Sequence, residues 1–287
     1  MSIEPRDPPT GRVEDEETYC YGHPKTPTKL RCSRCERPIC GRCAIPASVG
    51  QHCPECVAEA RKSAPKVRSA STANTPALVA IIGVTVLSFL AQQVIGSDYV
   101  QRLASIPFLI ALGEWWRLFT PVLVHAGFLH VAMNMFVLYI YGQNAEEAFG
   151  SMRFVAIYVV SALTGSAFSY GFGGLNSSVG ASGAVFGVVG ALIVYLYNRR
   201  SSQFIAQHLR GMLTFLALNA VIGFALPNID IMAHLGGLVG GLLLGFGFDR
   251  SRGAAKATSP VVLQVVTVLV VVGAAILLVM SRTNALT

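Results

Sequence analysis

Apolar stretches long enough to cross a bilayer, which takes roughly 20 residues, recur along the last three quarters of the sequence. They span residues 76–96, 126–148, 152–172, 180–198, 204–225, 231–248 and 260–281. The pattern predicts an all-α polytopic membrane protein with seven transmembrane helices. Residues 97–120 are too amphipathic for a span, and we expect them to lie in the membrane interface, with Trp115 and Trp116 at headgroup depth.

The first quarter of the chain has a different pattern. Residues 1–75 carry 12 of the 22 Lys and Arg residues and 9 of the 15 acidic residues, whereas the whole chain is 53% hydrophobic and only 13% charged. This contrast predicts a soluble head joined to a membrane portion. We divide the head into a disordered acidic N-terminus (1–17), a compact module (18–60) and a basic linker (61–75). The net charge of +7 is spread out with no basic stripe, so we expect no nucleic-acid partner.

All seven cysteines lie in the module, and together with one histidine they form four pairs, each with two residues between its members. The pairs are Cys20 with His23, Cys32 with Cys35, Cys40 with Cys43, and Cys53 with Cys56. A two-residue gap lets both side chains of a pair reach one ion, so eight ligands predict two structural zinc ions with no open position. His52 is a ninth candidate, and spacing alone does not say which pairs share an ion. A cluster of free thiols is the alternative.

The four pairs resemble the B-box and other cross-braced zinc modules, in which the first and third pairs share one ion. The resemblance implies two sites. They consist of Cys20, His23, Cys40 and Cys43, and of Cys32, Cys35, Cys53 and Cys56. The first 20 residues are acidic and polar rather than apolar, so we expect no export signal and a reducing, cytosolic environment for the thiols. The module is then expected to be a binding or regulatory head with a cytosolic protein partner.

Positive residues orient the predicted spans. The linker 61–75 and the connections after the fourth and sixth spans carry Lys and Arg, whereas residues 173–179 and 226–230 carry neither. Positive residues concentrate on the cytoplasmic side of membrane proteins. We therefore expect an integral protein of the cell (plasma) membrane with a cytoplasmic N-terminus and, after seven spans, an external C-terminus.

Several polar residues lie inside the predicted spans, where such groups are costly and suggest function. His130 and Asn134 are one helical turn apart, so they share a face. His234 is followed by Gly237 and Gly241, and Ser182 stands among glycines in "GASGAVFG". Small residues let helices approach closely. We therefore expect the Ser182 and His234 helices to pack with their side chains in hydrogen-bond reach.

These residue types fit nucleophilic catalysis. A serine needs a base, and histidine has a suitable pKa. His130, Asn134 and the Ser182 backbone N–H would then donate to a developing oxyanion. We expect Asp230 at the outer end of its span, which leaves a dyad rather than a triad. Each feature alone also fits helix packing, since a membrane-embedded histidine commonly bonds a neighbouring helix.

Together the motifs resemble the rhomboid family of intramembrane serine proteases. They are "WWR" at 115–117, His125 followed by "HVAMN" at 130–134, "GASG" at 180–183 and "AHLGGLVGG" at 233–241. The resemblance implies a six-helix rhomboid core (76–250) plus a seventh transmembrane helix (260–281), and cleavage of transmembrane-protein substrates within the lipid bilayer. It implies Ser182 as nucleophile and His234 as base, with His130 and Asn134 as oxyanion donors. Phe186 stands where some members carry a tyrosine that stacks on the catalytic histidine.

Two other classes of function stay open. One is a catalytically silent rhomboid-like protein that binds transmembrane clients, a class marked by loss of the serine or histidine. Both residues are present here. The other is a transporter, which is expected to show inverted repeats, and we find no clear repeat in the sequence.

Overall fold

The computed structural model describes residues 17–47, 49–63, 75–226, 229–251 and 259–286. The chain forms two compact units, Met1–Ser69 and Ala70–Thr287, each with its own core. Two predicted segments fall largely outside the described residues: the acidic N-terminus 1–17, except Glu17, and positions 64–74 of the linker.

The first unit is built from short elements around the cysteines. Two antiparallel pairs are followed by one helix: β1 (Tyr19–Cys20) with β2 (His23–Pro27), β3 (Ile45–Pro46) with β4 (Gln51–His52), and α1 (Pro54–Ser63). Among the described residues of this unit, Ile39 is the one buried apolar side chain besides six cysteines. So small an apolar core supplies little folding energy, which agrees with a module that depends on metal.

The second unit is helical. Its elements are α2 (Pro76–Ile95), α3 (Ser97–Leu103), α4 (Pro107–Ala111), the 3-10 turns η2 (Trp115–Leu118) and η3 (Thr120–Leu123), α5 (Phe128–Phe149), α6 (Ser151–Phe172), α7 (Ser182–Tyr197), α8 (Gln203–Ala225), α9 (Ile231–Arg250) and α10 (Pro260–Leu286). The seven long helices match the seven predicted segments within a few residues at each end. The predicted interfacial segment 97–120 consists of the short helices, in which Trp115 and Trp116 are exposed.

Five of the described helices, α2, α6, α8, α9 and α10, are long and apolar enough to cross a membrane. Helix α7 is apolar but has 16 residues. Helix α5 has 22 residues and is not among the five, and it carries Asn134, Glu146 and Glu147. The all-α polytopic membrane fold is therefore confirmed, while spanning by α5 and α7 stays a prediction.

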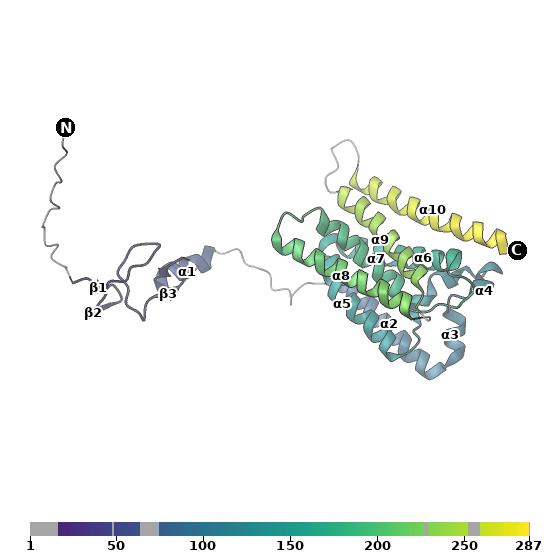
Figure 1. The fold of residues 1–287 in the computed structure, drawn as a ribbon, viewed down its shortest axis with the longest axis horizontal. Helices are drawn as coiled ribbons and strands as arrows, with labels where there is room; N and C mark the ends of the chain where they lie inside the picture. The colour runs from purple at the N-terminus through teal and green to yellow at the C-terminus, as the bar shows by residue number, and fades with distance from the viewer. Residues whose placement is uncertain (1–16, 48, 64–74, 227–228, 252–258, 287) are drawn as a thin grey trace, which may run out of the picture. The chain divides into compact units, whose positions relative to one another are not determined.

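Helices α6, α7 and α9 pack closely together, and α10 lies along one edge of the bundle against α6 and α9 (Figure 1). The closest approach is between α7 and α9. A Cβ atom added to Gly237 would lie 1.9 Å from the carbonyl oxygen of Gly183, so the two backbones touch. Only glycine permits this spacing. The G-x-x-x-G pattern thus brings the start of α7 against the start of α9.

A buried carboxylate joins three helices of this unit. Glu146, near the end of α5, is 3% exposed and accepts the N–H groups of Ala77 and Leu78 at 3.1 and 2.7 Å, as well as the Ser151 hydroxyl at 2.6 Å. It therefore caps the first turn of α2 and binds the first residue of α6. The favourable interaction of an anion with a helix N-terminus strengthens this contact.

We expect Glu146→Ala to destabilise the helical unit by roughly 2–4 kcal/mol, because it leaves buried donors without a partner. The thermal unfolding midpoint in detergent measures this loss. Glu147→Ala is a matched control, since Glu147 is the exposed neighbour on the same turn. Equal midpoints for the two variants would contradict the capping role.

Candidate functional site

Ser182 is the first residue of α7, and His234 lies in the first turn of α9. Their side chains meet: His234 Nε2 and Ser182 Oγ are 2.8 Å apart. This distance follows from the backbone contact between Gly183 and Gly237 described above, which holds the two helix starts together. Because Ser182 begins a helix, its own N–H has no partner within that helix. The arrangement brings together a hydroxyl, an imidazole and an amide that has no acceptor within its own helix.

The His234 ring is held by an aromatic neighbour. Phe186 lies one turn after Ser182, and its ring stacks on His234 with centroids 4.3 Å apart and an angle of 9° between the planes. Asp230 is the N-cap of α9: one carboxylate oxygen accepts the Ala233 N–H, and the other accepts the Ser169 hydroxyl. Both oxygens accept hydrogen bonds from these groups, and among the described contacts none comes from the imidazole, so the described geometry offers a pair of residues rather than three.

The His130 ring lies against Gly180, two positions before Ser182. A Cβ on Gly180 would fall 2.8 Å from His130 Nε2, and Gly180 has a φ of +118°, so the site requires glycine there. The N–H of Ala126 donates to His130 Nδ1 at 3.4 Å. Since Nδ1 accepts, the proton of the neutral ring belongs on Nε2. The ring therefore presents an N–H beside the start of α7.

Asn134 is buried one turn after His130 on α5. Its side-chain Nδ2 donates to the His130 carbonyl oxygen at 2.9 Å. An amide has two N–H groups, and this bond uses one of them. The residue is therefore bound to its own helix while retaining a second donor.

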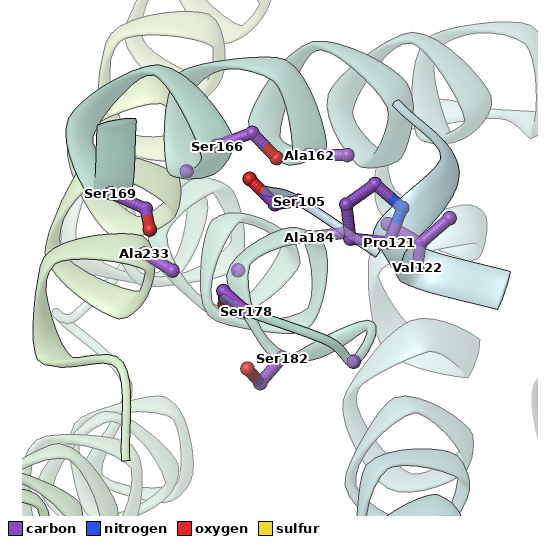
Figure 2. Close-up of a pocket in the computed structure, with 13 residues that line it drawn as sticks. Ser105, Pro121, Val122, Ala162, Ser166, Ser169, Ser178, Ser182, Ala184 and Ala233 are labelled. Atoms are coloured by element: carbon purple, nitrogen blue, oxygen red, sulfur yellow. The ribbon is translucent and has the colours of Figure 1, made fainter. Parts of the chain in front are cut away.

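A small cavity of about 20 Å³ has Ser182 among its lining residues. Serines from several segments line it, and Figure 2 shows Ser105 and Ser166 pointing toward the same space. A backbone bridge between Ser105 and Ser178, with both N–H···O bonds at 2.9 Å, closes one side. The sequence reasoning missed these serines, because isolated serines in apolar or loop segments follow no periodicity. These serines come close to the "GASG" segment only in the folded chain, so the structure is needed to identify them.

The first unit contains two clusters of metal-ligating side chains. Within each cluster the ligand atoms lie within 4.8 Å of one another, and the members are Cys20, His23, Cys40 and Cys43, and Cys32, Cys35, Cys53 and Cys56. These are the two sets that the cross-braced resemblance implies. His52 lies in neither cluster. All seven thiols are free rather than disulfide-bonded.

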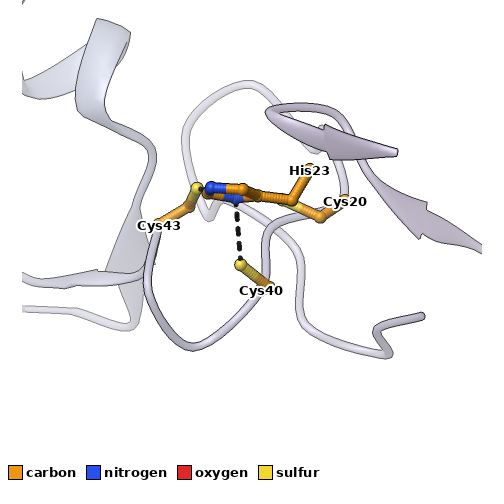
Figure 3. A group of neighbouring side chains, drawn as sticks. All are labelled: Cys20, His23, Cys40 and Cys43. Atoms are coloured by element: carbon orange, nitrogen blue, oxygen red, sulfur yellow. Dashed lines mark hydrogen bonds between the residues drawn. The ribbon is translucent and has the colours of Figure 1, made fainter. Parts of the chain in front are cut away.

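The spacing within the clusters fits a tetrahedral ion. Zinc–sulfur bonds of about 2.3 Å place two sulfur ligands about 3.8 Å apart. Cys20 and Cys43 Sγ are 3.8 Å apart, and Cys35 and Cys53 Sγ are 3.7 Å apart. Figure 3 shows the His23 ring beside the sulfurs of Cys40 and Cys43, with Nδ1 to Sγ distances of 3.4 and 3.2 Å. The residues present therefore fit two four-ligand zinc sites.

The Arg37 guanidinium favours the thiolate form of Cys35 in the second cluster. Arg37 Nε donates to Cys35 Sγ at 3.4 Å, and this hydrogen bond lowers the pKa of the Cys35 thiol. The thiolate is the form that binds metal. Arg37 is itself held by Glu55 through an ion pair of 2.6 Å.

Comparison with known proteins places the helical unit. The model of the Rhomboid domain matches residues 112–251, which include Ser182, His234, His130 and Asn134. The Rhomboid protease GluP of Bacillus subtilis is 44% identical over 134 residues, covering 46% of this chain and 26% of that protein. RHOMBOID-like protein 1 of Arabidopsis thaliana is 41% identical over 138 residues, which cover 47% of this chain and 35% of the relative.

A shorter relative aligns over most of its length. The "Putative rhomboid protease YdcA" of Bacillus subtilis is 40% identical over 139 residues, covering 48% of this chain and 69% of YdcA. The chain thus spans about a quarter of GluP and about two thirds of YdcA. The cysteine-rich unit lies outside the residues matched by the domain model. With this coverage and the motif order, the chain belongs to the rhomboid family.

Proposed function

We propose that the chain is an intramembrane serine endopeptidase that cleaves transmembrane-protein substrates with a dyad of Ser182 and His234. The observation that carries the proposal is the 2.8 Å contact between His234 Nε2 and Ser182 Oγ, made where two helices touch. The printed names of two relatives, "Rhomboid protease GluP" and "Putative rhomboid protease YdcA", support a peptidase activity.

In the proposed reaction His234 accepts the Ser182 proton as Oγ attacks a peptide carbonyl carbon. The imidazolium then gives that proton to the leaving amine nitrogen, and a water hydrolyses the resulting ester with His234 again as base. The cavity of about 20 Å³ supports the hydrolytic half, because a space of this size that is lined by several serines has room and hydrogen-bond partners for one water. Phe186 supports the dyad by fixing the plane of the imidazole.

The length of α7 supports a site below the membrane surface. Sixteen residues rise about 24 Å, less than the roughly 30 Å of the hydrocarbon core. Arg199 and Arg200 follow the end of α7, and we place them at the cytoplasmic surface of the plasma membrane. Ser182 then lies within the outer half of the bilayer. This orientation, with a cytoplasmic N-terminus, supports cleavage of single-span proteins within or just outside the outer leaflet.

Reconstitution tests the activity. The purified chain and a panel of single-span membrane proteins are placed in liposomes, and fragments are identified by mass spectrometry. We expect cleavage at or near the outer end of a substrate span, and no fragments with Ser182→Ala. A wild-type chain that cuts nothing in the panel, and whose Ser182 does not react with a serine-directed phosphonate, would count against a peptidase.

The proposed oxyanion donors are His130 Nε2, the second N–H of Asn134 and the Ser182 amide. Removing one such donor typically slows the chemical step by about 10²–10³-fold. We therefore expect Asn134→Ala to lower kcat by roughly that factor with little change in KM, because the bond forms fully only in the transition state. Turnover and melting temperature are measured on the same preparation.

Asn144→Ala is a matched control for this variant. Asn144 lies on the same helix and makes the same kind of bond, from Nδ2 to the Ile140 carbonyl at 2.9 Å, but it is exposed. We expect its kcat to equal that of the wild type. A destabilised but fully active Asn134→Ala enzyme would assign Asn134 to packing alone.

We further propose that each cysteine cluster holds one structural zinc ion. Four protein ligands at each site leave no open coordination position, and this supports a structural rather than a catalytic metal. The module would then act as a binding or regulatory head, with a cytosolic protein as its partner.

A further inference from the structure

Gln92, on α2, is bonded to a single residue by both ends of its side-chain amide. Its Nε2 donates to the His125 carbonyl oxygen at 2.7 Å, and the His125 N–H donates to its Oε1 at 3.0 Å. His125 lies in the connection between η3 and α5, which is neither helix nor strand. The Gln92 amide therefore bonds both backbone groups of His125, as a paired strand residue does, and fixes this irregular segment to α2.

The side chain of His125 contacts the residue that precedes α7. The ring is 1% exposed, and its Nε2 accepts the N–H of Ala181, the residue before Ser182, at 3.4 Å. The same ring meets His130 edge to face, with centroids 5.1 Å apart and an angle of 71° between the planes. His125 thus contacts both the backbone that carries Ser182 and the ring proposed as an oxyanion donor.

We infer that Gln92 and His125 are positioning residues of the active site, through which α2 sets the relative placement of the Ser182 turn and the His130 ring. The inference rests on the proposed function. Neither side chain is placed against the reacting atoms; Gln92 acts through His125. Donors to an oxyanion must be held within about 0.5 Å of their working positions. Gln92 lies outside residues 112–251, the part of the chain that the Rhomboid domain model matches.

Gln92→Met tests the inference against a matched control. Methionine keeps the length of the side chain and removes both hydrogen bonds. Gln93→Met makes the same change at the adjacent, exposed position. Because small displacements in an active site cost up to about 10²-fold, we expect Gln92→Met to lower kcat by about tenfold to a hundredfold per folded enzyme. KM should barely change, and Gln93→Met should match the wild type. Equal kcat for the two variants would overturn the inference.

A double-mutant cycle separates positioning from general stability. His125→Leu removes the ring while keeping a similar volume. If Gln92 acts through this ring, Gln92→Met should cause little further loss of kcat in a chain that already carries His125→Leu, because interacting residues are not additive. A full, multiplicative loss in the double variant would show that Gln92 acts independently of His125 and would overturn the assignment.

Amide hydrogen exchange provides a readout that does not require proteolysis. We expect residues 178–184 to exchange faster in full-length Gln92→Met than in Gln93→Met, since the hold on Ala181 is weakened, while α9 and α10 exchange alike in both. Unchanged exchange at 178–184 refutes the inference even if the enzyme is active. Absence of cleavage by the wild type, with this exchange difference present, refutes the proposed peptidase but not the coupling of α2 to α7.

Discussion

Replacing His234 by alanine should abolish the reaction of Ser182 with a serine-directed phosphonate. The hydroxyl is a weak nucleophile until a base removes its proton, and His234 Nε2 is 2.8 Å from it. Loss of the base in serine hydrolases costs a factor of roughly 10⁴ or more. We therefore expect labelling of the wild type, and none above background in His234→Ala or Ser182→Ala. The measurement is the rate of labelling, followed by mass spectrometry of the peptide that contains Ser182.

The control for this variant is another histidine of the helical unit. His208, on α8, is exposed and packs against Phe204, with ring centroids 6.2 Å apart. We expect His208→Ala to be labelled at the wild-type rate. Labelling of His234→Ala at that same rate would remove His234 from the mechanism and leave its contact with Ser182 as helix packing.

The hydrophobic pattern predicted the long helices well but placed the start of α7 two residues early. The apolar segment begins at Gly180, whereas the helix begins at Ser182. Gly180 has a φ of +118°, which a right-handed helix does not allow, and hydropathy carries no information on this angle. The difference matters for function. At the first position of the helix, the Ser182 N–H has no intrahelical acceptor, which supports its proposed role as an oxyanion donor.

The pairing of Ser182 with His234 was predictable because glycines mark where helices approach. The same holds in part for the two clusters of proposed zinc ligands. The spacing of the cysteines predicted the four pairs, and the resemblance to cross-braced modules was needed to combine them. In contrast, the contacts of Gln92 with His125 join a side chain to a backbone 33 positions away. No periodicity, propensity or motif predicts such a bond, since it depends on how a loop packs against a helix.

Removal of the proposed zinc ions is the second change from which we expect a large effect, namely unfolding of the first unit. Zinc binding to small cysteine modules provides about 10–16 kcal/mol of folding free energy at neutral pH. The described part of this unit has only Ile39 as a buried apolar residue besides cysteines, so it has little else to stabilise it. Elemental analysis of the purified full-length protein should give two zinc ions per chain. A chelator should remove both and make the segment 18–60 sensitive to limited proteolysis. The helical unit, which has a separate core, should keep its melting temperature.

Two histidines allow this prediction to be tested one site at a time. His23 belongs to the first cluster, whereas His52 precedes Cys53 and belongs to neither. His23→Ala removes one of four ligands and should lower the zinc content to about one ion per chain, because a three-ligand site in a small module holds its ion far less tightly. His52→Ala should retain two ions. If His52→Ala instead loses an ion while His23→Ala retains both, the cross-braced assignment of ligands is wrong. Two ions in both variants would mean that the cysteines alone bind the metal, since seven thiolates can share two ions through a bridging sulfur.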